Sequence, residues 1–290
     1  MPGSSGSNND GGYRVAGGGL VFLTVTGELK LDGIAESTGD WAGRNPGWND
    51  EANVGPGGTL NIRAGTLSGS GQIRAHGLER SYNSGADINY WGHSGGGRIA
   101  IRLTGENATF ANFNLANITA KGGSRTGQLN NQEALNKDPT GGATTNRFSS
   151  AGTIYLQTAS QAEGAGDIII RNDNNPLNQI PVTVIPALTY GGLDDDLSKA
   201  SLFIEDCARV KLAASFQLVA FRSQPGTNLD LNGKTLAVSY CTLGGKPLIQ
   251  KGAFSAAQLL DMGFAGVTDT SLEQTGLLEI KPFPTLFIVR

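Results

Sequence analysis

The stretch Gly57-Gly58-Thr59-Leu60-Asn61-Ile62-Arg63 opens a pattern that returns along the chain. Two further short segments follow it and end at Gly77, so one copy holds three segments. Other copies begin at Gly18-Gly19, Gly96-Gly97 and Ala151-Gly152. The second small residue of each pair recurs at steps of 39, 39 and 55 residues. A fixed step of this size is typical of repeat proteins.

Apolar residues occupy every second position within these copies, which is the periodicity of a strand with one buried face. The clearest pairs are Leu60 with Ile62, Ile99 with Ile101, and Ile154 with Leu156. Strands this short cannot bury one face alone, whereas coils stacked on one another can. We therefore predict an all-β fold, a parallel β-helix whose glycine pairs stack at one corner. A β-sandwich is the competing architecture, because it also has many short strands at regular spacing.

The composition excludes several classes of protein. The chain has 290 residues, of which 43 are glycine, but it shows no Gly-x-y period and is therefore not collagen. Charged residues make up 16% and the net charge is −3, so the basic face of a nucleic-acid binder is not apparent. No apolar run approaches the length of a membrane span. We expect neither a nucleic-acid partner nor a membrane span.

Residues 1–12 are rich in Gly, Ser and Asn and lack the basic and apolar regions of a signal peptide. We interpret them as a flexible linker and expect the chain to be part of a longer protein. The surface, rich in Asn, Thr and Gly, suits an extracellular or cell-surface protein. Cys207 and Cys241 are the only cysteines, and two interpretations stay open: a disulfide between neighbouring coils, or two buried thiols. Without a Cys/His cluster we expect no structural zinc.

Long polar insertions follow each of the first three copies, within the β-helix that we assign to residues 13–227. They span residues 40–56, 78–95 and 123–150. Because they leave equivalent points of successive coils, stacking should place them side by side on one face. Long loops on a rigid scaffold commonly carry function, so this face is the candidate site.

The first two insertions concentrate aromatic and ionisable residues. All three tryptophans of the chain lie there, and both histidines lie within or at the edge of the second insertion. Aromatic faces stack on sugar rings while polar groups bind the hydroxyls. The predicted substrate-binding residues are Trp41, Arg44, Trp48, Arg80, Tyr82, Tyr90 and Trp91. The alternative interpretation is a hydrophobic cluster that pins the loops to the coil. The third insertion has no Trp, Tyr or His, and we interpret it as a flap or disordered segment.

Beyond residue 172 the period weakens. Asp194-Asp195-Asp196 is interpreted as a solvated turn, because calcium loops space their ligands at alternate positions. We predict no metal site and no cofactor, and calcium stays open without a motif that specifies it. Residues 228–290 are expected to hold the last coils and a cap. This part comprises a strand, an Asn-Gly turn and a strand, then a helix over 256–262 begun by Ser255, and a final strand pair at 277–280 and 285–289.

Three motifs carry a resemblance to a known class: Gly-Gly-Arg-Ile-Ala-Ile at 96–101, Gly-Thr-Ile-Tyr-Leu at 152–156, and Leu-Asp-Leu-Asn-Gly-Lys-Thr-Leu at 229–236. They are similar to segments of secreted or surface bacterial β-helix proteins, the pectin-lyase-like and autotransporter-passenger class. The resemblance implies a right-handed parallel β-helix. The class includes polysaccharide lyases, glycoside hydrolases, adhesins and phage tailspikes. The shared residues are corner and core residues, so no catalytic residue is carried over.

We expect an extracellular protein that holds a polysaccharide or cell-surface glycan with its first two insertions. Whether it also degrades the glycan stays open. Hydrolysis requires two carboxylates that flank the scissile bond, and Asp50 or Glu51 with Asp87 is the candidate pair.

A polysaccharide lyase would instead need a base near neutral pKa, for which His93 or His76 is available. Arg80 or Arg44, or a cation, would neutralise the uronate. The alternative function is a non-catalytic structural or adhesin-type stalk of a larger surface protein.

Overall fold

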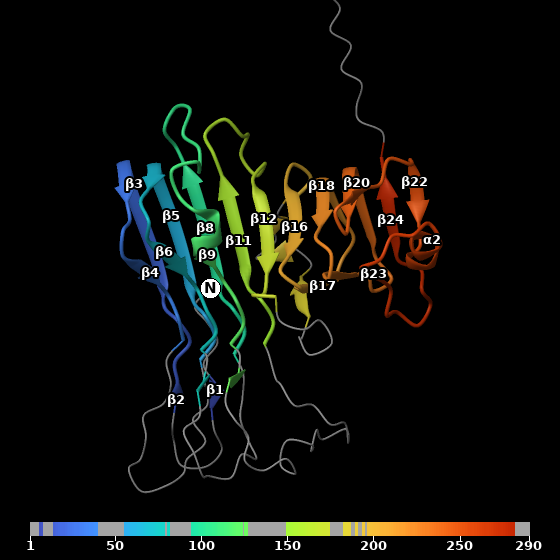
Figure 1. Cartoon of the computed structure of the whole chain (residues 1–290), viewed down its shortest axis with the longest axis horizontal. Coiled ribbons are helices and arrows are strands. Elements are labelled where there is room, and N and C mark those ends of the chain that lie inside the picture. Colours follow the sequence, from blue (N-terminus) through green and yellow to red (C-terminus); the bar gives the residue numbers. More distant parts are fainter. Residues whose placement is uncertain are drawn as a thin grey trace, which may run out of the picture.

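The computed structural model describes residues 6–7, 14–39, 55–78, 80–81, 94–123, 125–126, 149–174, 182–186, 189–190, 193–194 and 196–281. Strands dominate these residues, and one mostly parallel sheet of eleven strands runs from β3 (Leu20–Lys30) to β22 (Gly252–Phe254). Figure 1 shows this main sheet along the long axis of the molecule. The fold is therefore all-β, and its arrangement is consistent with a β-solenoid.

The first part of the main sheet contains β3, β5 (Thr59–Ser68), β8 (Arg98–Leu103) and β11 (Thr153–Gln157). All three pairings between them are parallel, which confirms the expected direction and argues against a sandwich built from antiparallel hairpins. The inward-facing pairs predicted from sequence are in register and between 0 and 4% exposed. Their members are Leu60, Ile62, Ile99, Ile101, Ile154 and Leu156.

A second parallel sheet comprises β4 (Ile34–Glu36), β6 (Gln72–Arg74) and β9 (Ile118–Thr119), with the 3-10 turn η1 (Leu115–Asn117) leading into β9. The glycine pairs lie at the corner before the main sheet. There the amide N–H of Thr59 donates to the carbonyl of Gly19 (2.9 Å), and that of Arg98 donates to the carbonyl of Gly58 (2.8 Å). The repeat corners therefore stack as the sequence predicted.

The direction of the main sheet reverses at β12 (Asp167–Arg171), which pairs antiparallel with β11. The strands that follow are parallel to β12 and to one another. They are β16 (Ser201–Glu205), β18 (Phe216–Ser223), β20 (Thr235–Leu243) and β24 (Leu277–Ile280). This reversal was not anticipated from the sequence.

Two hydrophobic cores lie on opposite faces of the main sheet. The first core contains Ile62, Ile101 and Ile169, and the second contains Ile170 and Leu202, with Ile168 packed against it. Successive side chains of a strand point to opposite faces. In β12, Ile169 therefore faces the first core while its neighbours Ile168 and Ile170 face the second.

A third parallel sheet covers the second core. It contains β13 (Thr183–Ile185), β17 (Arg209–Leu212), β19 (Asn228–Asp230) and β23 (Val267–Thr268). Here the repeat is shorter: Leu202 aligns with Phe221 and then with Cys241, at steps of 19 and 20 residues. The sequence appeared to lose its period in this part because the step had halved.

The C-terminal part closes one end of the second core. Ser255 begins helix α2 (Ala256–Asp261), and Ser255 and Gln258 form a reciprocal capping box, so the predicted start is confirmed. Leu259 of this helix is fully buried. Strand β22 pairs antiparallel with β24 and forms the edge of the sheet, while β21 (Lys246–Pro247) pairs with β20. The strand expected at 285–289 lies outside the described residues.

The remaining strands are short. They are β1 (Gly6–Ser7) with β2 (Arg14–Val15), β7 (Arg80–Ser81) with β10 (Arg125–Thr126), and β14 (Thr189–Tyr190) with β15 (Leu193–Asp194). The Asn232-Gly233 turn links β19 to β20, but these two strands lie in different sheets, so it forms a corner and not a hairpin.

Both cysteines are free thiols. Cys241 is buried in β20, and Cys207 is half-buried at a turn where its φ is +58°. The disulfide interpretation is wrong, and the two-thiol interpretation fits. Burial raises the pKa of the Cys241 thiol to about 12, so this group is an inert part of the second core.

Candidate functional site

The residues at which the three insertions begin and end lie side by side and alternate with one another. Leu78, which begins the second insertion, donates its N–H to the carbonyl of Gly55 at the end of the first (3.4 Å). Gly123, where the third insertion begins, donates to the carbonyl of Ser94 at the end of the second (2.9 Å). Ser149 then donates back to Gly123 (2.9 Å). We call this interleaved row of backbone the insertion edge.

The same row is connected to the glycine corners of the main sheet. Gly18 donates to the carbonyl of Pro56 (2.8 Å), and Gly57 donates to that of Gly95 (3.0 Å). Gly96 donates to the carbonyl of Ser150 (3.0 Å) in the same way. Each insertion therefore ends against the corner of the preceding repeat, so the three insertions end at equivalent points of successive repeats.

Close backbone approach explains why a glycine directly precedes each of the first two insertions. A Cβ on Gly77 would lie 1.9 Å from the carbonyl oxygen of Ser94, and one on Gly39 would lie 2.0 Å from that of Gly55. Both distances are shorter than any side-chain carbon tolerates, so only glycine lets the entering and leaving segments pack so closely.

Buried polar side chains bind the backbone of the insertion edge. The hydroxyl of Ser94, which is 4% exposed, accepts a hydrogen bond from the N–H of Leu78 (2.8 Å). Asn172, which is fully buried, accepts from Gly122 N–H (3.1 Å) and donates to the Ser149 carbonyl (3.0 Å). Its side-chain amide thus provides hydrogen-bond partners for the backbone at both ends of the third insertion. The sequence analysis missed Asn172, because nothing in its local pattern signals burial.

The second and third insertions also begin in parallel. β7 pairs with β10 so that Arg80 lies opposite Arg125 and Ser81 lies opposite Thr126. Arg80 is therefore placed, by its backbone, two residues beyond the insertion edge. The other candidates in the insertions lie outside the described residues: Trp41, Arg44, Trp48, Asp50, Glu51, Tyr82, Asp87, Tyr90, Trp91 and His93.

His76 lies next to the insertion edge, on the outer side of the second sheet. Its Nε2 is 2.6 Å from the hydroxyl of Thr119. Lys121 and Asp173 lie beyond it and form an ion pair of 2.9 Å. Buried and half-buried residues alternate along β6 and the segment that follows it: Ile73 and Ala75 are buried, whereas Arg74 and His76 are half-buried. A half-buried imidazole with a hydroxyl partner is thus available beside the insertions.

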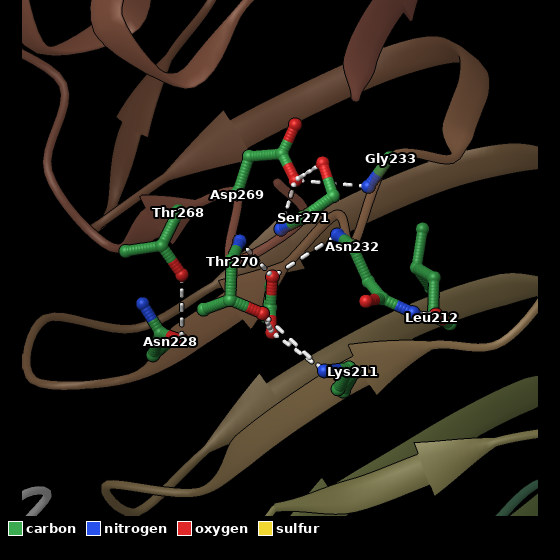
Figure 2. Close-up of polar contacts among 10 residues, drawn as sticks. Lys211, Leu212, Asn228, Asn232, Gly233, Thr268, Asp269, Thr270 and Ser271 are labelled. Atoms are coloured by element: carbon green, nitrogen blue, oxygen red, sulfur yellow. Dashed lines mark hydrogen bonds and ion pairs between the residues drawn. The ribbon is translucent and has the colours of Figure 1, made fainter. Parts of the chain in front are cut away.

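The densest polar cluster among the described residues lies elsewhere, at the C-terminal end of the second core (Figure 2). Asp230, which is 3% exposed, accepts hydrogen bonds from the N–H of Asn232 (3.0 Å) and from the hydroxyl of Thr270 (2.6 Å). The Nζ of Lys211 lies 3.6 Å from its second oxygen. The lone pairs of this carboxylate are occupied from three separate segments, so its role is structural.

Asp269 binds the neighbouring turn in the same cluster. One oxygen accepts from Gly233 N–H (2.8 Å) and from the hydroxyl of Ser271 (2.7 Å), and the other accepts from Gly276 N–H (2.6 Å). Burial opposes ionisation of Asp269, but these hydrogen bonds outweigh it and lower its pKa. The two carboxylates hold residues 267–276 against the corner between β19 and β20.

Within the part of the chain that the structure describes, no three His, Cys, Asp or Glu side chains are grouped so that they would hold a metal ion. Asp196 accepts a hydrogen bond from the Ser198 N–H (2.8 Å), as expected of a turn residue.

No helix among the described residues is long and apolar enough to cross a membrane.

Comparison with known proteins returned no match to any family model, curated protein or solved structure.

Proposed function

We propose that this chain is an extracellular, right-handed parallel β-helix that binds a polysaccharide through its insertions. The insertion edge supports the proposal. Its residues alternate in one hydrogen-bonded row, so the first two insertions, which contain every tryptophan of the chain, begin and end beside each other. Neighbouring strands lie about 4.8 Å apart, which is shorter than a sugar ring with its substituents. One glycan chain can therefore contact both insertions.

The direction reversal at β12 is compatible with a single β-helix. Between β11 and β12 the strand direction inverts, and the core passes to the opposite face of the sheet. The hand of a coil depends on the direction of its strands and on the face of the sheet that carries the core. Inverting both the direction and the face leaves the hand unchanged. We therefore propose that the two halves wind with the same hand, which is right-handed as the resemblance to secreted bacterial β-helices implies.

Cleavage of the bound glycan is the finer part of the proposal. Asp50 or Glu51 with Asp87 remains the candidate pair for hydrolysis, and His93 the candidate base for elimination. His76 adds a described imidazole beside the insertion edge. A non-catalytic stalk or adhesin-type domain is the second candidate function, favoured by the one continuous sheet that connects both cores.

The test of glycan binding compares Trp48→Ala and Trp91→Ala with the wild-type chain. We expect each variant to bind the polysaccharides of a panel at least about tenfold more weakly than the wild type, because a stacking platform is lost. The melting temperature should be unchanged, because the platform lies outside the repeating core. Affinity is measured by gel-shift and calorimetry, and released sugars are assayed in parallel.

Tyr240→Ala is the matched control, because Tyr240 is 39% exposed on β20, in the second half of the main sheet and far along the chain from the insertions. It should leave glycan binding unchanged. If the tryptophan variants lose stability and keep their affinity, the aromatic residues pin the loops and the proposal fails. Binding without any released sugar would favour the stalk or adhesin.

A further inference from the structure

Three arginines lie on the outer face of the first part of the main sheet. In β5 and β8 the inward positions alternate with Arg63, Arg98 and Arg102, and all three side chains are exposed. Arg63 is directly opposite Arg102 in the register of the two strands. We call this surface the arginine face.

None of these arginines has an acidic partner among the described residues. The ion pairs among the described residues involve other side chains. Within that part of the chain, the one contact made by the side chains of the three arginines is that of Arg102, whose guanidinium carbon is 5.1 Å from the centre of the Tyr155 ring. Like charges directly opposite each other on a sheet are destabilising. The chain carries a net charge of −3, so a general excess of basic residues does not account for this local concentration.

The geometry of the face suits a ligand with spaced negative charges. Arg63 and Arg102 are on neighbouring strands, about 4.8 Å apart at the backbone. Arg98 and Arg102 are four residues apart on one strand, or about 13 Å. Guanidinium groups bind carboxylate and sulfate groups through paired hydrogen bonds. The face therefore presents cations on two sides of a central row.

That central row is uncharged and ends in aromatic rings. Phe22, Asn61, Ala100 and Tyr155 are successive partners across β3, β5, β8 and β11. Phe22 is 69% exposed at one end. At the other, the hydroxyl of Tyr155 donates to Gln157 (2.9 Å) and accepts from Gly166 N–H (3.2 Å), which fixes the ring. Rings flanking an amide and a methyl group offer surfaces for sugar rings and a partner for hydroxyls.

We propose that the arginine face binds an acidic polysaccharide, one that carries carboxylate or sulfate groups. Arg63, Arg98 and Arg102 hold the anions, and the sugar rings lie along the row between Phe22 and Tyr155. A nucleic acid fits less well, because three cations on a chain of net charge −3 neutralise few phosphates. The site lies on the main sheet and not on the insertions, so it does not depend on the proposed function.

The experiment measures binding of fluorescent dextran, dextran sulfate, polygalacturonate and a single-stranded DNA oligonucleotide. We expect the protein to bind dextran sulfate or polygalacturonate and not dextran, with an affinity that falls as salt rises from about 50 to about 300 mM. The double variant Arg63→Thr/Arg98→Thr should bind these acidic polymers at least about tenfold more weakly. Threonine is favoured in strands, so the fold should be retained.

Arg222→Thr is the matched control. Arg222 is also exposed on the main sheet, but it belongs to the second half and lies between the rings of Phe203 and Tyr240, at 5.5 and 5.1 Å. Arg222→Thr removes one positive charge, as each substitution in the double variant does. It should leave the binding of the acidic polymers unchanged. The melting temperature of the double variant should not fall, because a like-charge contact is relieved.

Four outcomes would overturn the proposal. These are an absence of binding to both acidic polymers, equal affinity of the double variant and the wild type, an equal loss in Arg222→Thr, and stronger binding of the oligonucleotide than of either polysaccharide. Tryptophan variants of the insertions should not change binding at this face. Failure of one site is thus distinguished from failure of the other.

Discussion

At the residue scale, individual polar side chains form hydrogen bonds that the repeat pattern does not reveal. Asn172 uses both ends of its amide to satisfy backbone groups at the last insertion. Asp269 collects hydrogen bonds from Gly233, Ser271 and Gly276 and holds the C-terminal turn. A buried polar group without such partners costs about 1–3 kcal/mol, so each partner set stabilises the fold.

Asp269→Asn should lower stability most at neutral pH. The pKa of Asp269 is lowered in the folded chain from its ordinary value of 3.8. A lowered pKa contributes stability that is present above the unfolded pKa and is lost as pH falls through the folded pKa. The loss, about 1 kcal/mol, should therefore shrink below pH 3.8. Denaturant unfolding at several pH values measures it.

Ser271→Ala provides the second variant, because it removes one donor and keeps the carboxylate. It should give a smaller loss of stability at neutral pH than Asp269→Asn. A loss in Asp269→Asn that stays constant from neutral pH to acid would show that ionisation of this group does not contribute.

At the element scale, the spacing of backbone segments decides which residues are tolerated. The strands of the main sheet form wherever alternating apolar residues meet a stacked neighbour, as in β5 and β8. The insertion edge is more demanding, because its segments approach more closely than side chains allow. Gly77 is the clearest case, since a Cβ there would lie 1.9 Å from the Ser94 carbonyl.

Gly77→Ala should destabilise the protein by more than about 1 kcal/mol, because the backbone at Ser94 must move to admit a methyl group. Gly19→Ala is the control: a Cβ there meets nothing within 4 Å, so stability should be unchanged or rise by up to about 1 kcal/mol. Thermal unfolding of the two variants checks the difference. Equal melting temperatures would contradict the close packing of the insertion edge.

At the scale of the whole molecule, two cores share one sheet. The first core is packed against one face up to β12, and the second is packed against the other face from β12 onward. Stability in stacked repeats is carried by contacts between nearest neighbours. The junction at β11 and β12 therefore connects two units that need not unfold together.

Ile101→Ala should weaken the first core by about 2–5 kcal/mol, because Ile101 is fully buried there. We expect hydrogen exchange to accelerate in β5, β8 and β11, while amides in β18 and β20 keep most of their protection. Phe221→Ala, in the second core, should give the converse pattern. Uniform acceleration across both halves in either variant would show a single cooperative unit.

The sequence by itself determined strands of the first half, their parallel pairing and the side-by-side placement of the insertion ends that the structure describes. It did so because alternation at a fixed step of 39 residues places Leu60 on Ile99 and Gly58 on Gly97, and burial follows from the alternation. The same step also places Arg63 on Arg102, so the arginine face was encoded there but not recognised. The start of helix α2 was likewise readable, since the capping box is local.

Only the tertiary structure decided the reversal at β12, the transfer of the core to the opposite face and the burial of Asn172. Ile168, Ile169 and Ile170 are alike in sequence, and pairing across the sheet alone determines which core each one joins. The sequence analysis assigned no role to the side chains of Asp230 and Asp269, because their partners come from segments up to 40 residues away. Local pattern specifies elements because it acts over a few residues. The choice of neighbour depends on packing between distant segments, which no local pattern records.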